Sequence, residues 1–268
     1  MIRVAVLGGG RMGTALLGGL LQSGWDAVDL CVAEAEPERR HEIETAYPGV
    51  RVVPSAAWAV ADAGVAVVAV KPGDVRDVLE SAMTALGPET LVLSLAAGVK
   101  ISAIEECVPG RPVVRAMPNT PALVRKGASA IAGGSSATDI HLDLAERLLG
   151  AVGVVARVGE HLLDAVTGLS GSGPAYVFLV VESMVEAGVL AGIPRETAEL
   201  LVTQTLVGSA ALLAEGDESA EQLRAAVTSP GGTTAAGLRE LETRGVRAAF
   251  LDAVAAATRR SVELGRGD

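Results

Sequence analysis

Hydrophobic residues follow two different patterns along the 268-residue chain. Up to about residue 157, short Val-rich runs alternate with longer stretches of helical periodicity. Several of these runs are continuously apolar, as in parallel strands that helices cover on both faces. We expect strands at residues 2–7, 28–33, 50–53, 65–70, 91–95, 113–117, 129–132 and 154–157. With helices such as 12–23 and 138–149 between them, the alternation predicts an α/β fold with an N-terminal Rossmann-like, doubly wound sheet.

The strand pattern ends near Gly159, and only helical periodicity follows. Pro194 suits the first turn of a helix, and Gly192 and Gly245 suit the joints between helices. The expected helices are residues 162–167, 174–191, 194–215, 219–227, 233–243 and 246–264. The sequence therefore predicts two domains, a Rossmann domain over residues 1–158 and an all-α domain over residues 159–268.

Composition and charge narrow the possible partners. Half of the residues are hydrophobic and the net charge is −10, which opposes binding to nucleic acid or to an anionic membrane. The two cysteines and three histidines are scattered without metal-ligand spacing, so we expect neither a disulfide framework nor a metal site. No stretch reads as a signal peptide or a membrane span, because Glu182 and Glu186 interrupt the apolar run after Pro174. We expect a cytoplasmic protein.

A glycine-rich segment follows the first expected strand. Residues 4–13 read VAVLGGGRMG, a GxGxxG motif between a strand and a helix. In such motifs the glycines permit a tight turn and close approach to a pyrophosphate, and the helix N-terminus attracts the phosphates. The expected cofactor contacts here are Gly8, Gly9, Gly10, Arg11, Met12 and Gly13. The motif alone is weak, because a plain strand-to-helix turn can have the same glycines.

The residues after the second expected strand leave the choice of cofactor open. Glu34 stands where an acidic residue can bind the adenosine ribose hydroxyls, which favours NAD. Arg39 and Arg40 follow and could neutralise a 2′-phosphate, which favours NADP, or could form the exposed face of the next helix.

Four further segments carry a specific resemblance. They read AVKP at residues 69–72, VRAMPNTP at 114–121, DAVTGLSGSGPAY at 164–176 and VTSPGGTT at 227–234. With the N-terminal loop, they make the chain similar to the pyrroline-5-carboxylate reductase family over nearly its whole length. The resemblance implies reduction of 1-pyrroline-5-carboxylate to L-proline by NADPH or NADH, the last step of proline biosynthesis.

The resemblance also assigns roles to residues. It implies that Glu160 contacts the substrate, that residues 167–174 shape the substrate pocket and the subunit interface, and that Thr167 is the candidate for a hydrogen bond to the ring nitrogen. The further cofactor contacts that it implies are Val70, Lys71, Pro72, Ala96, Ala97, Gly98 and Asn119.

The VTSPGGTT segment also has a physical interpretation of its own. Its glycines expose backbone N–H groups, its hydroxyls are donors, and a helix begins at its end, so it can hold an anion without a cation. We expect the substrate carboxylate to bind Ser229, Gly232, Thr233 and Thr234. The alternative is an ordinary capped helix.

Two other functions compete with an imine reductase. A β-hydroxyacid dehydrogenase of similar architecture would carry a catalytic Lys in its helical domain, but no Lys follows Lys126. A non-catalytic dinucleotide sensor would not need the carboxylate-binding segment.

The expected helices of the all-α domain are apolar around their circumference, as at residues 200–213. Such helices need cover on every side, which predicts a homodimer through residues 174–264 or a larger ring of dimers.

Overall fold

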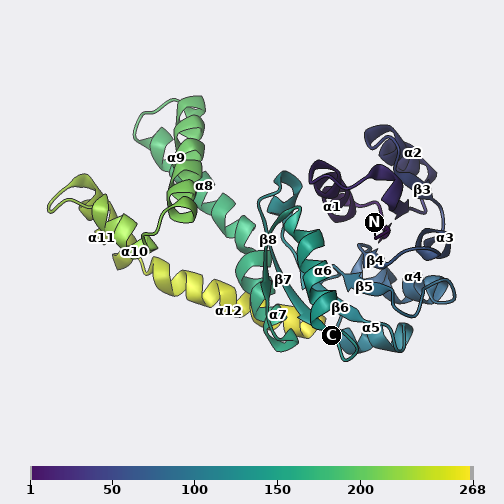
Figure 1. Ribbon diagram of the computed structural model, residues 1–268. Helices are drawn as coiled ribbons and strands as arrows, with labels where there is room; N and C mark the ends of the chain where they lie inside the picture. The colour runs from purple at the N-terminus through teal and green to yellow at the C-terminus, as the bar shows by residue number, and fades with distance from the viewer. Residues whose placement is uncertain (1, 266–268) are drawn as a thin grey trace. The chain divides into compact units, whose positions relative to one another are not determined.

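A computed structural model of the protein describes residues 2–265, and Figure 1 shows the order of its elements. The chain forms two compact units. The first contains the residues up to Ser172 together with the segment from Ala256 onward, and the second is Gly173–Ala255.

The first unit is built on one eight-stranded sheet. The strand order is β3-β2-β1-β4-β5-β6-β7-β8, and every neighbouring pair is parallel except β6 and β7. The strands are β1 (Val4–Leu7), β2 (Leu30–Ala33), β3 (Arg51–Val53), β4 (Val65–Val68), β5 (Leu91–Ser94), β6 (Val113–Met117), β7 (Gly127–Gly133) and β8 (Gly153–Arg157). The predicted doubly wound Rossmann-like sheet is confirmed, with β7 turned back by the short 3-10 helix η3 (Thr120–Val124).

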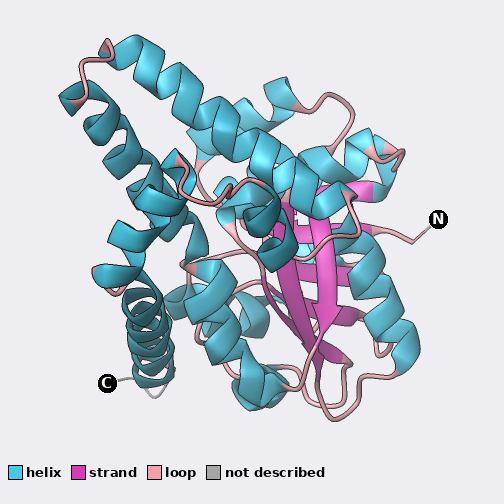
Figure 2. Cartoon of the chain, turned by 90° about the vertical axis from the view of Figure 1, so that its left-hand side faces the viewer, coloured by secondary structure: helices cyan, strands magenta, loops and turns pink. Residues whose placement is uncertain are grey.

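Helices cover both faces of this sheet, as Figure 2 shows. One apolar cluster contains Leu16 and Leu20, and the cluster on the other face contains Leu79 and Ile104; all four side chains are buried. The helices of this unit are α1 (Arg11–Gln22), α2 (Pro37–Ala46), α3 (Ala56–Val60), α4 (Val75–Ala82), α5 (Ile101–Cys107), α6 (Asp139–Gly150) and α7 (Leu163–Val166), with 3-10 turns η1 (Ala27–Asp29), η2 (Pro72–Asp74) and η4 (Glu160–Leu162). Burial on both faces explains why β1, β2, β4 and β5 are continuously apolar.

Residues 160–172 belong to the packing of the sheet unit. Leu163 is fully buried in the cluster that contains Leu79 and Ile104. The compact unit therefore extends to Ser172, whereas the predicted boundary after residue 158 coincides with the end of the last strand.

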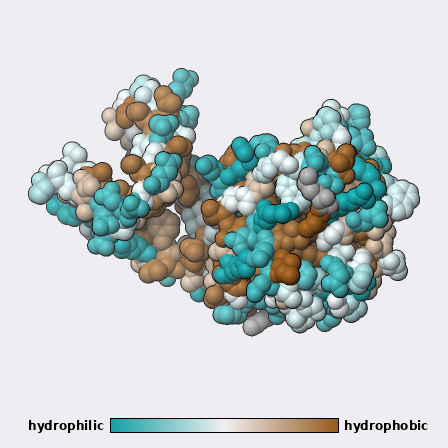
Figure 3. Space-filling view, viewed as in Figure 1, coloured by the Kyte–Doolittle hydropathy of each residue, from teal (hydrophilic) through white to brown (hydrophobic). Residues whose placement is uncertain are grey.

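The second unit consists of helices, namely α8 (Gly173–Leu190), α9 (Arg195–Glu215), α10 (Ala220–Ala226), α11 (Thr233–Thr243) and the first part of α12 (Val246–Leu264). Much of its apolar surface is uncovered, as the brown areas on α8 and α9 in Figure 3 show. Large hydrophobic residues that are more than half exposed include Phe178, Leu179, Leu190, Leu200, Leu201, Val207, Leu212 and Leu251.

The expectation that no segment reaches the length of a membrane span is wrong by length and composition. Residues 160–190 and 195–215 form helices long and apolar enough to cross a membrane. The glutamates at 182 and 186 do not lower the mean hydropathy of the first helix enough to exclude it. Helices that form a subunit interface also expose apolar surface in a single chain, so the apolar length of these helices fits an interface as well as a membrane.

Candidate functional site

Three glycines of the segment that joins β1 to α1 have different surroundings. Gly8 has a φ of +107°, and a Cβ there would lie 2.9 Å from Cγ1 of Val70. A Cβ on Gly13 would overlap the carbonyl oxygen of Gly8, so this glycine permits the close packing of helix and strand. A Cβ on Gly10 would meet no atom within 4 Å. The packing of the protein alone therefore gives no reason for a glycine at position 10.

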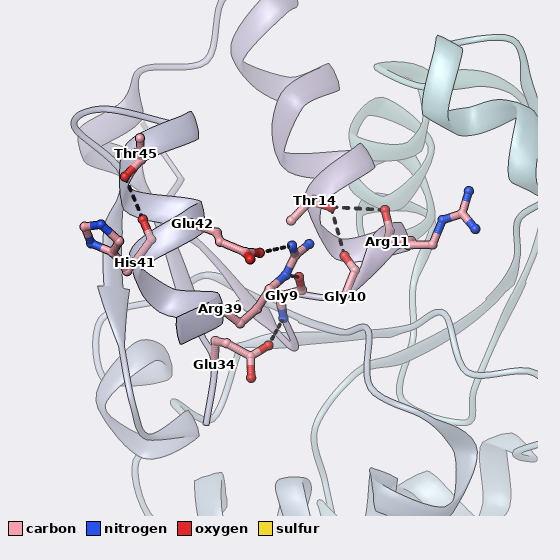
Figure 4. A network of polar contacts seen from close by, with 9 residues as sticks. All are labelled: Gly9, Gly10, Arg11, Thr14, Glu34, Arg39, His41, Glu42 and Thr45. Atoms are coloured by element: carbon pink, nitrogen blue, oxygen red, sulfur yellow. Dashed lines mark hydrogen bonds and ion pairs between the residues drawn. The ribbon is translucent and has the colours of Figure 1, made fainter. Parts of the chain in front are cut away.

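Figure 4 shows how Gly9 is held between two charged side chains. Its N–H donates to Oε2 of Glu34 at 2.9 Å, and its carbonyl accepts from Nε of Arg39 at 2.9 Å. A second backbone N–H, that of Glu36, donates to Oε1 of Glu34 at 3.0 Å. The Glu34 carboxylate is thus fixed at the end of β2 by two backbone donors.

The two arginines after Glu34 already have partners. Arg39 also pairs with Glu42 at 2.5 Å, and Nη1 of Arg40 donates to the carbonyls of Glu34 and Ala35 at 3.0 and 2.6 Å. These bonds hold both guanidinium groups against the loop backbone, so a 2′-phosphate would have to compete with them.

A first cavity of about 720 Å³ opens where β1 and β4 end. Ligands bind at this point in doubly wound sheets, because the strand order reverses there and leaves a crevice. Of the predicted cofactor residues, it is lined by Gly8, Gly10, Glu34, Val70 and Lys71. Ala56, Glu36 and Asp74 also line it. Three carboxylates and one lysine therefore surround this cavity.

A second cavity of about 570 Å³ lies on the other side of the turn after β4. It is lined by the predicted residues Pro72, Ala97, Gly98 and Thr167, and by Gly73, Val99, Ser172, Ala257, Arg260, Ser261 and Leu264. The last four belong to the end of α12, which packs with the sheet unit. No local sequence signal indicated these four residues, because they join the cavity only through tertiary contact.

Thr167 begins a π-helical turn, η5 (Thr167–Gly171), where the sequence indicated a plain bend between two helices. The N–H of Ser172 donates to the carbonyl of Thr167 at 2.8 Å, and the Thr167 hydroxyl donates to the carbonyl of Leu163 at 2.8 Å. π turns are rare and occur often at functional sites. Here the hydroxyl proton is committed to the helix, which leaves the oxygen lone pairs to accept a hydrogen bond from a ligand.

Asn119 supports the π turn. Its Nδ2 donates to the carbonyl of Ser170 at 3.0 Å, and its Oδ1 accepts from the N–H of Ala128 at 2.8 Å. Both ends of the amide are therefore bonded to the protein, and Asn119 contributes by holding η5 rather than by facing either cavity. Its predicted contact with the cofactor stays a prediction.

Glu160 has protein partners in this structure. Its Oε1 accepts from the N–H of Ile101 at 2.7 Å and pairs with Nη1 of Arg115 at 3.1 Å. Arg115 is only 3% exposed, so Glu160 compensates a buried positive charge and caps α5. A substrate contact by Glu160 stays a prediction, and a Glu160 variant would change stability as well as binding.

The SPGGTT turn lies in the second unit and leads into α11. Gly231 has a φ of +69°, and a Cβ on Gly232 would overlap Oγ of Ser229, so this hydroxyl lies against the start of the helix. No side chain among residues 2–265 caps α11. The N–H groups of its first turn, at Thr233 and Thr234, are therefore free to bind an anion, with the helix dipole in support.

The remaining predicted residues have simpler positions. Arg11 is exposed at the first position of α1, Met12 packs against the core, and Ala96 is buried in the apolar cluster that contains Leu79. Among residues 2–265, no group of three or more His, Cys, Asp or Glu side chains gathers into a metal-binding cluster.

Two family models match the chain. One, described as pyrroline-5-carboxylate reductase dimerisation, matches residues 160–264. The other, described as NADP oxidoreductase coenzyme F420-dependent, matches residues 3–98. The two matches correspond to the helical part and to the part that carries the glycine-rich loop.

Whole-chain comparisons agree with these matches. A pyrroline-5-carboxylate reductase of Mycobacterium tuberculosis is 46% identical, with 98% of this chain and 97% of that protein covered. One of Synechocystis is 42% identical over 99% of both. A solved pyrroline-5-carboxylate reductase of Coxiella burnetii has a TM-score of 0.95 and 37% identity over 98% of both chains. A Plasmodium falciparum pyrroline carboxylate reductase, solved with NADP bound, has a TM-score of 0.85 and 29% identity over 98% of both chains.

Proposed function

The chain belongs to the pyrroline-5-carboxylate reductase family and reduces 1-pyrroline-5-carboxylate to L-proline with NAD(P)H, the last step of proline biosynthesis, and we propose which of its residues carry out each part of this reaction. The observation that supports the proposal best is that Thr167 and the loops after β4 and β5 line one cavity. The direct test is oxidation of NADPH and of NADH by the purified protein with pyrroline-5-carboxylate.

The first cavity fits the adenosine and pyrophosphate half of the cofactor. The open space at Gly10 and the uncapped N-terminus of α1 suit a pyrophosphate, and Glu34 suits the ribose hydroxyls. Val70 and Lys71 line the same cavity, while Pro72, Ala97 and Gly98 line the second cavity, which suits the nicotinamide half. In this proposal Gly8, Gly9, Met12 and Gly13 complete the cofactor-binding loop, Ala96 and Asn119 lie on the nicotinamide side, and Arg11 flanks the phosphates.

Little acid–base chemistry is needed from the protein, because a protonated imine is already an electrophile. When bound, the reduced nicotinamide supplies the hydride from C4. Thr167 accepts a hydrogen bond from the iminium N–H, because its own proton is donated to Leu163, and this contact holds the imine carbon in place. Hydride addition then gives the secondary amine of proline directly, with no further proton required.

The carboxylate of the substrate binds Ser229, Gly232, Thr233 and Thr234 in this proposal. The support is the free N–H groups at the start of α11 and the position of the Ser229 hydroxyl. Neutral donors suffice for one carboxylate when a helix dipole assists them. Residues 1–158 thus serve the cofactor, and residues 159–268 serve the substrate and self-association.

Glu34 is expected to set the balance between the two cofactors. Both NADH and NADPH should support turnover, with the carboxylate favouring the free ribose. Replacing Glu34 with Gln removes the charge and keeps an acceptor for Gly9, and Glu34→Ala removes both. Each should raise the NADPH-to-NADH ratio of kcat/KM by about tenfold, since relief of about 1–2 kcal/mol of repulsion corresponds to that factor.

Steady-state kinetics with both cofactors measure this ratio. Glu38→Ala, on the exposed first turn of α2, is the matched control and should leave the ratio unchanged. An unchanged ratio in both Glu34 variants would place Glu34 away from the ribose.

The enzyme self-associates through its helical part. We propose that the dimer forms through residues 174–264 and that dimers join into a larger ring, in the cytoplasm and without a membrane or a nucleic acid as partner. The exposed apolar residues of α8 and α9 support this proposal, because a second copy of the same surface can cover them.

Light scattering tests this assembly. We expect the wild type, at micromolar concentration, to have a mass of at least twice the 27.1 kDa of one chain. Leu200→Glu, at a position 69% exposed on α9, should reduce the mass or prevent folding, because a charge in an apolar interface is costly. Ile140→Glu, at a position 75% exposed on α6, is the control and should keep the wild-type mass. A monomeric wild type would contradict the assembly.

A further inference from the structure

The end of α12 forms a wall of the second cavity. Ala257, Arg260, Ser261 and Leu264 line it together with Thr167. Beyond the helix, Gly265 lies against Gly98 of the loop after β5; a Cβ on Gly265 would be 3.1 Å from the Gly98 carbonyl oxygen. Residues near the end of the chain thus lie beside the reacting part of the proposed site.

One hydrogen bond connects this wall to the helix that leads into the π turn. The Ser261 hydroxyl donates to Oδ1 of Asp164 at 2.6 Å, and Ser261 is only 6% exposed. Asp164 precedes Thr167 by one helical turn, so the two side chains are on the same face of the helix. Figure 1 shows the yellow end of α12 beside α7.

The π turn and the helix before it are bonded to residues from other parts of the chain. Its wider hydrogen-bond pattern occurs in proteins mostly as single turns. Asn119 holds the carbonyl of Ser170 on the downstream side, and the Ser261–Asp164 bond holds the helix on the upstream side. Thr167 lies between the two supports.

We propose that Ser261 and Asp164 are positioning residues for the reduction, and that their hydrogen bond fixes the direction of the Thr167 hydroxyl and the shape of the cavity wall. This inference rests on the proposed contact between Thr167 and the ring nitrogen. Neither residue reacts; they restrict Thr167 to the orientation in which the imine carbon meets the hydride donor.

The first test replaces the donor. Ser261→Ala should lower kcat about tenfold, because one hydrogen bond that positions Thr167 is lost. The KM for NAD(P)H should stay within about twofold of the wild-type value. Ser261→Thr keeps the hydroxyl and should restore most of kcat. Ser102→Ala makes the same change at an exposed position of α5 and should have no effect. Melting temperature and mass are measured for each variant, and Ser261→Cys replaces Ser261→Ala if that protein does not fold.

The second test is a double-mutant cycle with Thr167→Val, which removes the hydroxyl and keeps the shape. In the Thr167→Val background, Ser261→Ala should change kcat by less than about twofold, because residues that act through one another are not additive. A normal kcat in Ser261→Ala, no rescue by Ser261→Thr, or equal losses in both backgrounds would overturn the inference. A normal kcat in Thr167→Val would instead overturn the proposed role of Thr167, and the inference with it.

Discussion

Gly10→Ala is expected to weaken the binding of NADPH and NADH strongly, in a protein that folds normally. The new methyl group would meet no protein atom within 4 Å, and Gly10 has a φ of −69° that any residue can adopt. The methyl would occupy the space proposed for the pyrophosphate. Losing two charge-assisted hydrogen bonds, at about 1.5–3 kcal/mol each, weakens binding by about 100-fold or more.

Fluorescence titration with NADPH and NADH measures this loss, and thermal unfolding checks the fold. Gly150→Ala is the matched control, because a Cβ there also meets no atom within 4 Å but lies at the end of α6. Gly13→Ala makes the contrast, since its Cβ would overlap the Gly8 carbonyl and should lower the melting temperature as well. Normal cofactor affinity in Gly10→Ala would remove the pyrophosphate from this position.

Ser229→Ala and Thr234→Ala are each expected to lower kcat/KM for pyrroline-5-carboxylate by one to two orders of magnitude. A hydrogen bond to a charged group contributes about 1.5–3 kcal/mol, and the loss concerns the substrate carboxylate alone. Cofactor affinity should hardly change. The melting temperature should also hold, because neither side chain caps α11.

A nearby serine provides the control for a purely structural role. Ser219 is a true N-cap, whose hydroxyl accepts from the N–H of Gln222 at 3.3 Å at the start of α10. Ser219→Ala should cost about 1 kcal/mol of stability and leave the kinetics normal. If Ser229→Ala and Thr234→Ala behave like Ser219→Ala, with unchanged kcat/KM, the carboxylate assignment fails.

The sheet and the glycine-rich loop could be predicted because their signals are local. Continuous apolar runs identify strands that are buried on both faces, and the spacing of Gly8, Gly10 and Gly13 identifies the turn. The π turn could not be predicted in this way, because small residues at 167–173 fit a bend equally well. Two polar partners lie far away in sequence: Gly9 is 25 residues from Glu34, and Arg115 is 45 residues from Glu160, so no spacing of residues indicated them.

Ser261 shows most clearly which site residues could not be predicted from sequence. It is 97 residues from Asp164 in sequence, and within its helix it resembles any other small polar residue. Only the packing of the chain's end against the sheet unit gives it a neighbour and a cavity. By contrast, the apolar circumference of α9 can be recognised from sequence, and a helix apolar all round must be covered on every side. Its place in the subunit interface stays a prediction.

The path of the chain has a consequence for folding. The sheet unit is assembled from the residues up to Ser172 and a return segment that begins at Ala256. The second cavity therefore gets its α12 wall only when residues on either side of Gly173–Ala255 come together, and contacts between residues so far apart in sequence form slowly. The glycine-rich loop connects two neighbouring elements, β1 and α1, and its turn is local in sequence. We therefore expect the loop to form earlier in folding than the wall beside Thr167.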